Sequence, residues 1–461
     1  MTYRARRVLF LFSILVFLAL SGPLLLYTFG YRFSLSNLTV RETGGVFVHA
    51  NPAGARVHVG STTRAASFLT GNAFIQNLDP GHHTVTVSRA GFQQWEKTIT
   101  VEPRSVIEIS PVLAPLMPVS AYLNTASTTG MRASPNGSIL VLRGSQAPEN
   151  PYYVFDTNLQ RILPPADVLS RTRLQSIAED ARFFWNERAT EALIETPDDW
   201  LILTRANNTI RGRSLYLHSA LFSVLSEKPF YVARDPANQN SYFILSETDF
   251  SRWNTATETI SPLLQSIAGF SVFPDRLMLW DTQSNLPYST SLDATGAAPY
   301  ATSSLPGVTR ARMVEHTDSV VLLADTGMWH LSPDHGPLLL TKRYSAERVA
   351  FTNAYILWWD NTSITIYWTL PEEHLPLFQK TRMETIYTTQ NTIAHVAPYP
   401  QQPYIILQEN NAIYTLELDG RGGSRNKHML YEGKDPTFHV PTDEKILYIL
   451  DEESVFTIEL P

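Results

Sequence analysis

RASPNGSILVL at residues 132–142, followed by YYVFD at residues 152–156, is the stretch that decides the fold of this chain. Ser-Pro-Asn-Gly favours a tight turn. The apolar runs that follow the turn have the length and the β-branched and aromatic content of short strands. The stretch therefore predicts one unit of an antiparallel sheet, a turn followed by two short strands.

The same unit, a turn followed by two short apolar strands, recurs down to the C-terminus. Eight starts over roughly 345 residues give a period of about 43, inside the range of about 40 to 50 expected for β-propeller blades. We therefore predict a propeller of seven or eight blades over residues 116–461, its count left open by the irregular stretch 160–230. The seven further starts pair residues 183–186 with 192–194, 230–232 with 242–245, 270–275 with 277–280, 314–316 with 320–323, 349–351 with 355–359, 393–396 with 404–407, and 437–440 with 445–450.

The first unit also resembles a blade of the WD-like or Tol-type propellers, in which Ser-Pro-(Asp/Asn)-Gly makes the first hairpin. Radial packing lets such units bury both of their faces. We expect a strand from residues 116–125 to pair with the last blade and close the ring. A series of β-sandwiches is the alternative architecture, and it would require Pro/Gly linkers between modules, of which none stands out.

Residues 44–115 alternate apolar and polar residues with the period of β-strands. Turn sequences separate the runs, among them PAGA at 52–55, LDPG at 78–81 and AGF at 90–92. A Pro-rich segment at 111–118 reads as a hinge to the following domain. The pattern predicts a compact antiparallel sandwich with strands near residues 46–48, 57–59, 84–87 and 98–101.

This order of strands and turns resembles the PEGA domain, above all LDPGHHTVTV at 78–87 followed by AGF at 90–92 and Trp95. The resemblance covers nearly all of residues 44–113. It implies an extracytoplasmic surface module that serves as a spacer or stalk and has no catalytic residues. The chain departs from the family pattern at Ala53 in place of the name-giving Glu, at Gly60 in place of an Asp-Gly hairpin, and at residues 71–74.

The N-terminus has the pattern of a membrane anchor. Residues 8–29 carry no charge, and as a helix they would extend about 33 Å at about 1.5 Å per residue, close to the roughly 30 Å of a bilayer's hydrocarbon core. Three arginines precede this segment. By the positive-inside rule we expect a cytoplasmic tip at residues 1–7, a transmembrane helix at 8–29 and the bulk of the chain outside the cytoplasm.

A cleaved signal peptide is the alternative reading of this segment, because Ala19-Leu20-Ser21 offers small residues at a suitable spacing. The apolar run continues beyond that point to Phe29, which favours an uncleaved anchor.

Composition and charge limit the possible function classes. Charged residues make up 17% and aromatic residues 11% of the 461 residues, which favours β-rich folds. The first 43 residues carry a net charge of +4 and the remainder −11, so we expect no nucleic-acid partner, which would need clustered Lys and Arg. The chain has no cysteine, which excludes a disulfide framework, thiolate zinc sites and thiol catalysis.

The strongest catalytic candidate is Asp325-Thr326-Gly327, which is similar to the active-site turn of an aspartic protease. That chemistry needs two carboxylates that share a proton, and a second copy is missing. Asp156 and Asp281, each followed by Thr, occupy the same place in their own repeats, which indicates a recurring hairpin turn. Phosphate-loop, zinc-protease and nucleophile-elbow motifs are absent from the sequence. We predict no catalytic, cofactor-binding or metal site, and the ligand-binding residues stay unassigned.

Histidines and tryptophans are the remaining candidates for a binding site. Four histidines of the small domain could be imagined around a metal, although no convergent carboxylate accompanies them. Tryptophans of the large domain could stack on sugars or anchor a protein partner if exposed, but packing between blades is the favoured reading. Adjacent Trp358 and Trp359 must face opposite sides of their strand. The residues concerned are His49, His58, His82 and His83, and Trp185, Trp200, Trp253, Trp280, Trp329, Trp358, Trp359 and Trp368.

The order of segments suggests a single-pass envelope or surface protein in which a spacer lifts a propeller off the membrane. We expect the propeller to bind a protein or polysaccharide partner at the cell surface. This hypothesis is architectural, because propellers host many functions. The alternatives are an envelope-assembly factor with a partner in the same membrane, and a hydrolase or lyase acting on surface glycans with catalytic groups along its central channel.

Overall fold

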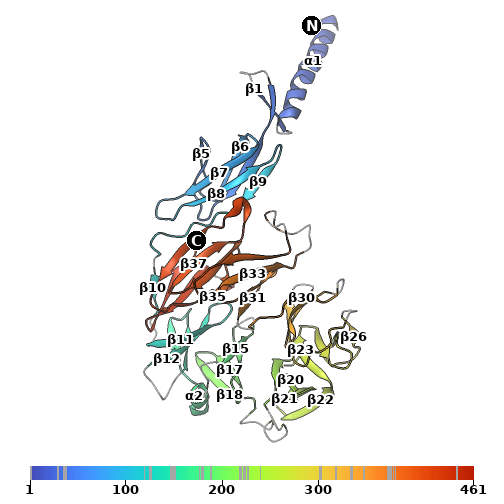
Figure 1. Ribbon diagram of the computed structural model, residues 1–461, viewed down its shortest axis with the longest axis vertical. Helices are drawn as coiled ribbons and strands as arrows, with labels where there is room; N and C mark the ends of the chain where they lie inside the picture. Colours follow the sequence, from blue (N-terminus) through green and yellow to red (C-terminus); the bar gives the residue numbers. More distant parts are fainter. Residues whose placement is uncertain are drawn as a thin grey trace.

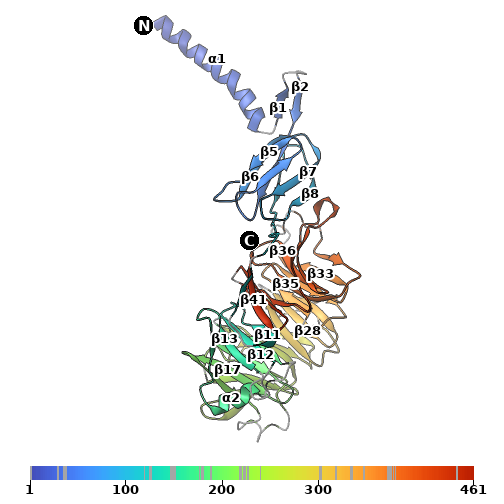
Figure 2. The same ribbon diagram turned by 90° about the vertical axis from the view of Figure 1, so that its left-hand side faces the viewer.

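A computed structural model gives the fold of the chain as three parts in a row. Figures 1 and 2 show the N-terminal helix at one end, a small β domain next to it, and a large ring of sheets at the other end. The structure describes residues 3–28, 31–34, 39–118, 120–123, 127–145, 152–175, 177, 181–186, 189–216, 221, 225, 228–238, 240–300, 304–316, 319–332, 336–345, 348–370, 376, 378, 381–442 and 445–461.

The N-terminal segment is the helix α1 (Tyr3–Thr28), followed by a hairpin of β1 (Tyr31–Ser34) and β2 (Thr39–Glu42). Within the described part of the chain, no helix combines the length and the apolarity needed to cross a membrane. The predicted transmembrane helix over residues 8–29 is therefore not supported, and Phe29 lies outside the described residues.

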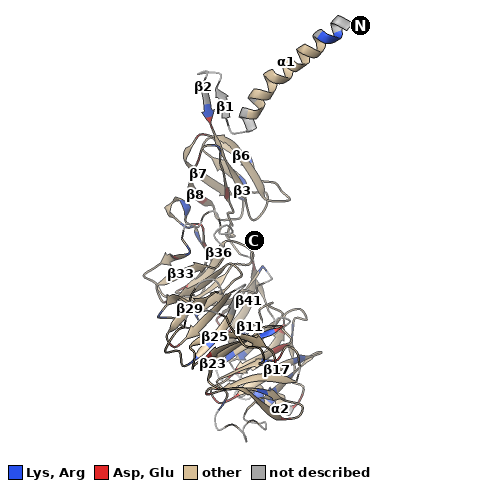
Figure 3. Ribbon diagram, turned by 90° about the vertical axis from the view of Figure 1, so that its right-hand side faces the viewer, with Lys and Arg blue, Asp and Glu red and all other residues tan. Residues whose placement is uncertain are grey.

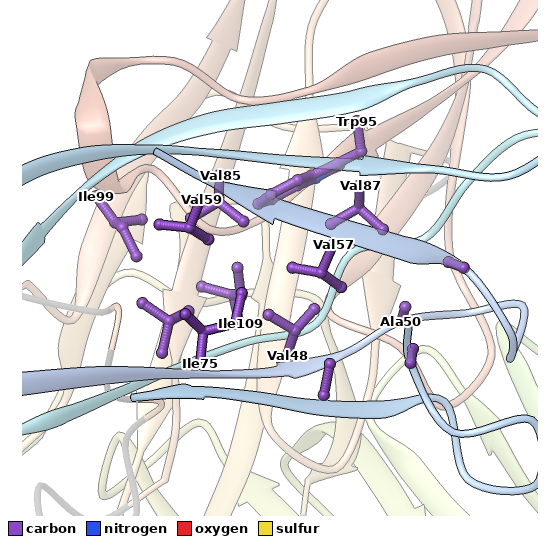
Figure 4. Close-up of a cluster of buried hydrophobic side chains, with 14 of the residues drawn as sticks. Val48, Ala50, Val57, Val59, Ile75, Val85, Val87, Trp95, Ile99 and Ile109 are labelled. Carbon is purple, nitrogen blue, oxygen red and sulfur yellow. The ribbon is translucent and has the colours of Figure 1, made fainter. Parts of the chain in front are cut away.

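The small β domain is a sandwich of two sheets in the strand orders β5-β4-β7-β8 and β6-β3-β9. Valines and isoleucines from both sheets meet in its core around Trp95, which is fully buried (Figure 4). Alternation of buried and exposed residues along β8 explains why one face of that strand packs inward. The strands are β3 (Gly44–His49), β4 (Arg56–Val59), β5 (Thr62–Ala65), β6 (Asn72–Leu78), β7 (Gly81–Ser88), β8 (Trp95–Val101) and β9 (Val106–Ile109).

Two details of this domain differ from the sequence prediction. Strand β9 pairs with β3 in parallel, so the sandwich is not wholly antiparallel. The reason is topological, since the chain after β9 must leave at the end of the domain where β3 also finishes, next to the ring. The segment 71–74, read as a degraded turn, contains the start of β6.

The large domain is built from eight four-stranded antiparallel sheets within the described residues. Each of the eight predicted strand pairs falls within one of these sheets. The sheets consist of β11 (Thr128–Ala133), β12 (Ile139–Gly144), β13 (Tyr152–Asp156) and β14 (Arg161–Leu163); β15 (Arg182–Trp185), β16 (Glu191–Glu195), β17 (Trp200–Ala206) and β18 (Thr209–Ser214); β19 (Tyr231–Arg234), β20 (Ser241–Ser246), β21 (Asp249–Asn254) and β22 (Thr259–Leu264); β23 (Ile267–Val272), β24 (Arg276–Asp281), β25 (Leu286–Ser291) and β26 (Ala298–Pro299); β27 (Ala311–His316), β28 (Ser319–Ala324), β29 (Gly327–Leu331) and β30 (Leu338–Thr341); β31 (Val349–Phe351), β32 (Tyr355–Trp359), β33 (Ser363–Trp368) and β34 (Met383–Thr388); β35 (Ile393–Pro398), β36 (Tyr404–Glu409), β37 (Ala412–Glu417) and β38 (Lys427–Glu432); and β39 (Thr437–His439), β40 (Ile446–Asp451), β41 (Ser454–Glu459) and β10 (Ser120–Tyr122).

These sheets close into a ring, the arrangement of a β-propeller. One buried apolar cluster lies between each sheet and the next, and a last cluster joins the sheet of β39–β41 to the sheet of β11–β14. As predicted, the strand β10 pairs with β41, so an N-terminal strand completes the C-terminal sheet. Pairing the first and last strands of the propeller in one sheet closes the ring.

The irregular stretch between the first two sheets contains the helix α2 (Val168–Gln175). This helix packs on β18, where the Ser170 hydroxyl accepts a hydrogen bond from Gly212 N at 3.0 Å and the Arg173 side chain donates to Gly212 O at 3.0 Å. A short helix inserted at this point explains why the repeat pattern fades there.

Candidate functional site: the cleft between the two domains

The connection between the small domain and the ring is packed against the ring. Val112 and Leu113 are fully buried, and Val112 N donates to the Tyr404 hydroxyl at 3.1 Å. A second bond joins the two domains, because the Gln93 side chain of the small domain donates to Met429 O of the ring at 2.7 Å. The segment 111–118, predicted as a hinge, is therefore largely held in place and joins the two domains firmly.

A buried ion cluster fixes the contact. The ammonium of Lys97 on β8 is fully buried and lies 2.8 Å from Glu417 Oε2 and 3.7 Å from Asp419 Oδ2, and it donates to the Asp419 carbonyl at 2.5 Å. Burial raises the pKa of Glu417 although Lys97 opposes that shift. A buried charge is tolerated only when it is paired and hydrogen-bonded, so the two domains depend on each other at this point.

Next to this cluster, the short helix η3 (Arg421–Gly423) contacts β8. Gly422 has a φ of +78°, and a Cβ at this position would lie 2.0 Å from the Thr98 carbonyl oxygen. Only glycine accommodates both this conformation and this approach. The Arg421 guanidinium extends from the same turn onto the Asp419 carboxylate at 2.8 Å.

A cleft of about 770 Å³ opens between β8, β9 and this turn. Its volume is within the range of about 300 to 1,000 Å³ typical of ligand sites. A second cavity of about 160 Å³ shares Glu108, Phe378 and Arg421 with it. The cleft is lined by Ile99, Thr100, Glu102, Ser105, Val106, Ile107 and Glu108 of the small domain and by Phe378, Thr381, Glu384, Gly420, Arg421, Gly422, Gly423 and Arg425 of the ring.

The cations of the cleft are already neutralised. Arg421 is paired with Asp419, and Arg425 is paired with Glu384 at 2.8 Å. The exposed carboxylates of Glu102 and Glu108 form no ion pair with any described residue. The free charge of the cleft is therefore negative.

The centre of the ring is filled where three innermost strands meet. The guanidinium of Arg312 on β27 lies 4.6 Å from the ring centroid of Phe184 on β15 and 5.9 Å from that of Tyr231 on β19. On other innermost strands, burial lowers the pKa of His395 and of His439 to about 4. Both imidazoles are therefore neutral at pH 7.

The carboxylates considered in the sequence occupy hairpin turns. Asp156 accepts hydrogen bonds from the backbone N–H groups two and three residues ahead, and Asp281 does the same. Asp325 instead accepts from the backbone and the hydroxyl of Thr309. The structure does not bring the three carboxylates into one hydrogen-bonded group: Asp156 and Asp281 stabilise their own turns, and Asp325 holds the segment at Thr309.

The four histidines of the small domain each have a local partner. His49 contacts Asn72, His58 contacts Thr63, His82 contacts Thr100, and His83 contacts the carbonyl of Asp79. Among the residues that the structure describes, no three His, Cys, Asp or Glu side chains are grouped to hold a metal ion.

The tryptophans of the large domain pack between sheets. Six of them are buried and Trp185 and Trp329 are half-buried. Trp358 belongs to the cluster shared with the preceding sheet and Trp359 to the cluster shared with the following sheet. The prediction that these two neighbours face opposite sides is confirmed.

Sequence reasoning did not find the cleft, because its two walls, residues 99–108 and residues 378–425, lie at least 270 residues apart in the chain. The segment DGRGGSR at 419–425 was the available signal. Three glycines and two arginines in seven residues indicate a tight, cationic turn, but nothing local to it indicates the surface that it meets.

Comparison with known proteins agrees with this description. Residues 43–116 match the family model of the PEGA domain. No curated protein matches the chain.

Several solved structures are similar in fold to this chain. One is the β-propeller domain of Cps50 (Swd1) from Myceliophteria thermophila, with 11% identity, 74% of this chain and 100% of that chain covered, and a TM-score of 0.37. The WD40 domain of SCAP from fission yeast has 11% identity, coverages of 74% and 98%, and a TM-score of 0.40. Dipeptidyl peptidase 4 of Porphyromonas gingivalis has 8% identity, coverages of 70% and 56%, and a TM-score of 0.44. These likenesses extend to the fold alone, and the Tol-type resemblance stays a prediction.

Proposed function

We propose that this chain is a membrane-attached envelope protein whose PEGA domain carries an eight-bladed propeller outside the cytoplasm, where the propeller and its junction bind a protein or surface polymer. The observation that carries the proposal is the row of exposed apolar side chains along α1. Single exposed apolar residues are common on proteins, but a contiguous apolar surface marks contact with a membrane or a partner.

The helix α1 supports membrane attachment through its surface chemistry. The only charged residues in the coloured part of the α1 ribbon lie near its N-terminal end (Figure 3), and the sequence identifies them as Arg6 and Arg7. Lipid provides the apolar surroundings that these side chains need, and the N-terminal arginines favour a cytoplasmic start. Eleven apolar side chains are between 40% and 69% exposed, those of Leu9, Phe10, Leu11, Phe12, Ile14, Leu15, Phe17, Leu18, Leu20, Leu24 and Leu25.

The firm junction supports the role of the PEGA domain as a spacer. Because Lys97 is buried against Glu417 and Asp419, the spacer and the propeller are held in a fixed orientation. A fixed spacer sets both the distance and the direction at which a binding surface is presented.

We propose binding rather than catalysis as the activity. The most buried carboxylates of the propeller are engaged in structural contacts, for example Glu409 with Lys427, Thr389 and Asn391. Burial alone would raise the pKa of Glu409, but these hydrogen bonds outweigh it and lower the pKa to about 2. A carboxylate that is held ionised in this way is poorly suited to act as a general acid or base near neutral pH.

Protease shaving of intact cells that carry N- and C-terminal tags tests this proposal. We expect the C-terminal tag to be lost to protease, while the N-terminal tag stays in the membrane fraction after washing at high salt and at alkaline pH. A variant with Leu15→Lys and Leu18→Lys should leave the membrane fraction, and Glu258→Lys on the ring should not.

Two results would contradict the proposal. A C-terminal tag that is cut only after the cells are broken would refute the exposed location. Release of the unmodified chain by salt or alkali would refute attachment through the apolar surface of α1.

A further inference from the structure

Strand β9 pairs with β3 along one edge, and no strand of the described residues pairs with its other edge. It is the last strand in the order β6-β3-β9, and its residues line the cleft. An edge strand presents unpaired backbone N–H and C=O groups, which another extended segment is able to pair with.

The register shows which backbone groups face the cleft. Gly45 N donates to Ser105 O at 2.9 Å and Asn51 N donates to Pro111 O at 2.9 Å. Since alternate residues of a parallel strand bond to the same neighbour, the odd-numbered residues of β9 point their backbone groups toward β3. Val106 and Glu108 point theirs away from β3. The Arg421 side chain donates to Glu108 O at 2.7 Å from the ring side, in agreement with this direction. Glu108 O is therefore already bonded, and an added strand would pair mainly with the backbone groups of Val106.

The cleft has room and apolar surface for a short strand. Val106 to Ile109 are four residues, and at about 3.3 Å per residue an added strand beside them would extend about 13 Å. Val106 is 52% exposed, and the half-buried Phe378 packs 6.0 Å from the ring of Trp368. The side chains of an added strand would therefore meet an aliphatic and an aromatic surface.

Charge selects the chemistry of that strand. Glu102 and Glu108 are the unpaired charges of the cleft, and its arginines are neutralised by Asp419 and Glu384. Opposite charges on adjacent strands stabilise pairing, whereas like charges oppose it. A segment that carries Lys or Arg fits this edge, and an acidic segment does not.

We propose that the cleft between the PEGA domain and the propeller binds an extended, lysine- or arginine-bearing peptide segment of a partner protein, which adds as a strand to the open edge of β9. Strand addition of this kind gains affinity from main-chain hydrogen bonds and specificity from side chains. The inference rests on the proposed binding function and names the site and the class of partner.

Peptide binding to the full chain in nanodiscs tests this inference by fluorescence anisotropy. The probes are a labelled Val-Lys-Val-Lys-Val-Lys hexapeptide, its counterpart with Glu in place of Lys, and the basic peptide with N-methyl groups on alternate residues. We expect the basic probe to bind at least about tenfold tighter than the other two, because like charge and a missing donor each oppose pairing.

Variants of β9 distinguish strand addition from general charge attraction. Val106→Pro removes one outward N–H, and proline is tolerated on an edge strand when its nitrogen faces away from the sheet. We expect Val106→Pro to weaken binding of the basic probe by about fivefold, which is the effect of one hydrogen bond. The thermal midpoint of unfolding should stay unchanged. Glu102→Gln with Glu108→Gln should reduce the preference for the basic probe, and Glu96→Gln, outside the cleft, should preserve it.

The inference is overturned if the acidic or the N-methylated probe binds as well as the basic one, or if Val106→Pro binds it unchanged. These outcomes are independent of the tag experiment, so the peptide-binding inference can be refuted while the proposed membrane attachment and exposure stand.

Discussion

Replacing Lys97 with Met should destabilise the whole molecule, because this substitution leaves the buried carboxylate of Glu417 without its cation. The Lys97 side chain is fully buried and that of Glu417 is 3% exposed. Removing one partner of a buried ion pair costs about 3 to 5 kcal/mol. Arg421 still holds Asp419, and Asn426 still donates to Glu417, so we expect a loss near the lower end, about 3 kcal/mol of unfolding free energy.

The loss should shrink as the pH falls. Burial already raises the pKa of Glu417 above its ordinary value, and loss of Lys97 raises it further. A raised folded-state pKa means that the ionised form opposes folding at high pH and that protonation removes this penalty. The deficit of Lys97→Met relative to the unmodified protein should therefore be largest at pH 7 and narrower near pH 5.

Urea unfolding followed by tryptophan fluorescence measures this loss, since Trp95 lies 5.8 Å from the Lys97 ammonium. Adding Glu417→Gln to Lys97→Met should recover more than half of the lost free energy. The matched control is Lys434→Met, which breaks the exposed contact with Glu452 and should change nothing measurable. A loss below about 1 kcal/mol, or equal losses at pH 7 and pH 5, would refute the reasoning.

Two further predictions concern the junction and the ring centre. Gly422→Ala should lower the unfolding free energy by about 1 to 3 kcal/mol, because the added Cβ would meet the Thr98 carbonyl. The control is Gly423→Ala, at a similar φ but with open space around it, which should lose less unfolding free energy in the same urea assay. Equal losses for the two variants would contradict the steric argument. Because burial lowers the pKa of His395 and His439 to about 4, the unfolded chain binds protons first as the pH falls below about 6.5. The unfolding free energy should therefore fall between pH 6.5 and pH 4.5 by on the order of 2 kcal/mol per histidine. In urea unfolding curves across that range, the double variant His395→Gln with His439→Gln should show a weaker pH dependence of the unfolding free energy. An unchanged pH dependence would show that other groups cause it.

The junction between the two domains should also affect binding in the cleft. The buried ion cluster lies between the PEGA domain and the sheet of β35–β38, and the cleft lies between the PEGA domain and two neighbouring sheets, β31–β34 and β35–β38. A partner bound in the cleft would contact both domains at once, so its affinity should depend on the intact junction. Lys97→Met should consequently weaken binding of the basic peptide probe as well as lower the unfolding free energy.

Local sequence determined the units of this protein. Period-2 alternation and Ser-Pro-Asn-Gly or Asp-Pro-Gly turns encode strands and hairpins within a few residues, so the eight repeats and most strands of the PEGA domain were readable. The two-sided packing of Trp358 and Trp359 followed from strand geometry alone. These features need no knowledge of distant partners.

Only the tertiary structure decided how those units meet. Strand alternation places Lys97 on the same face as Trp95 and Ile99, but nothing in the sequence around it indicates its partners Glu417 and Asp419, which are about 320 residues away. The parallel pairing of β9 and the cleft beside it depend on where the ring sits against the small domain. The physical reason is that a side chain's burial and charge environment are set by the surface that covers it, and that surface comes from a remote part of the chain.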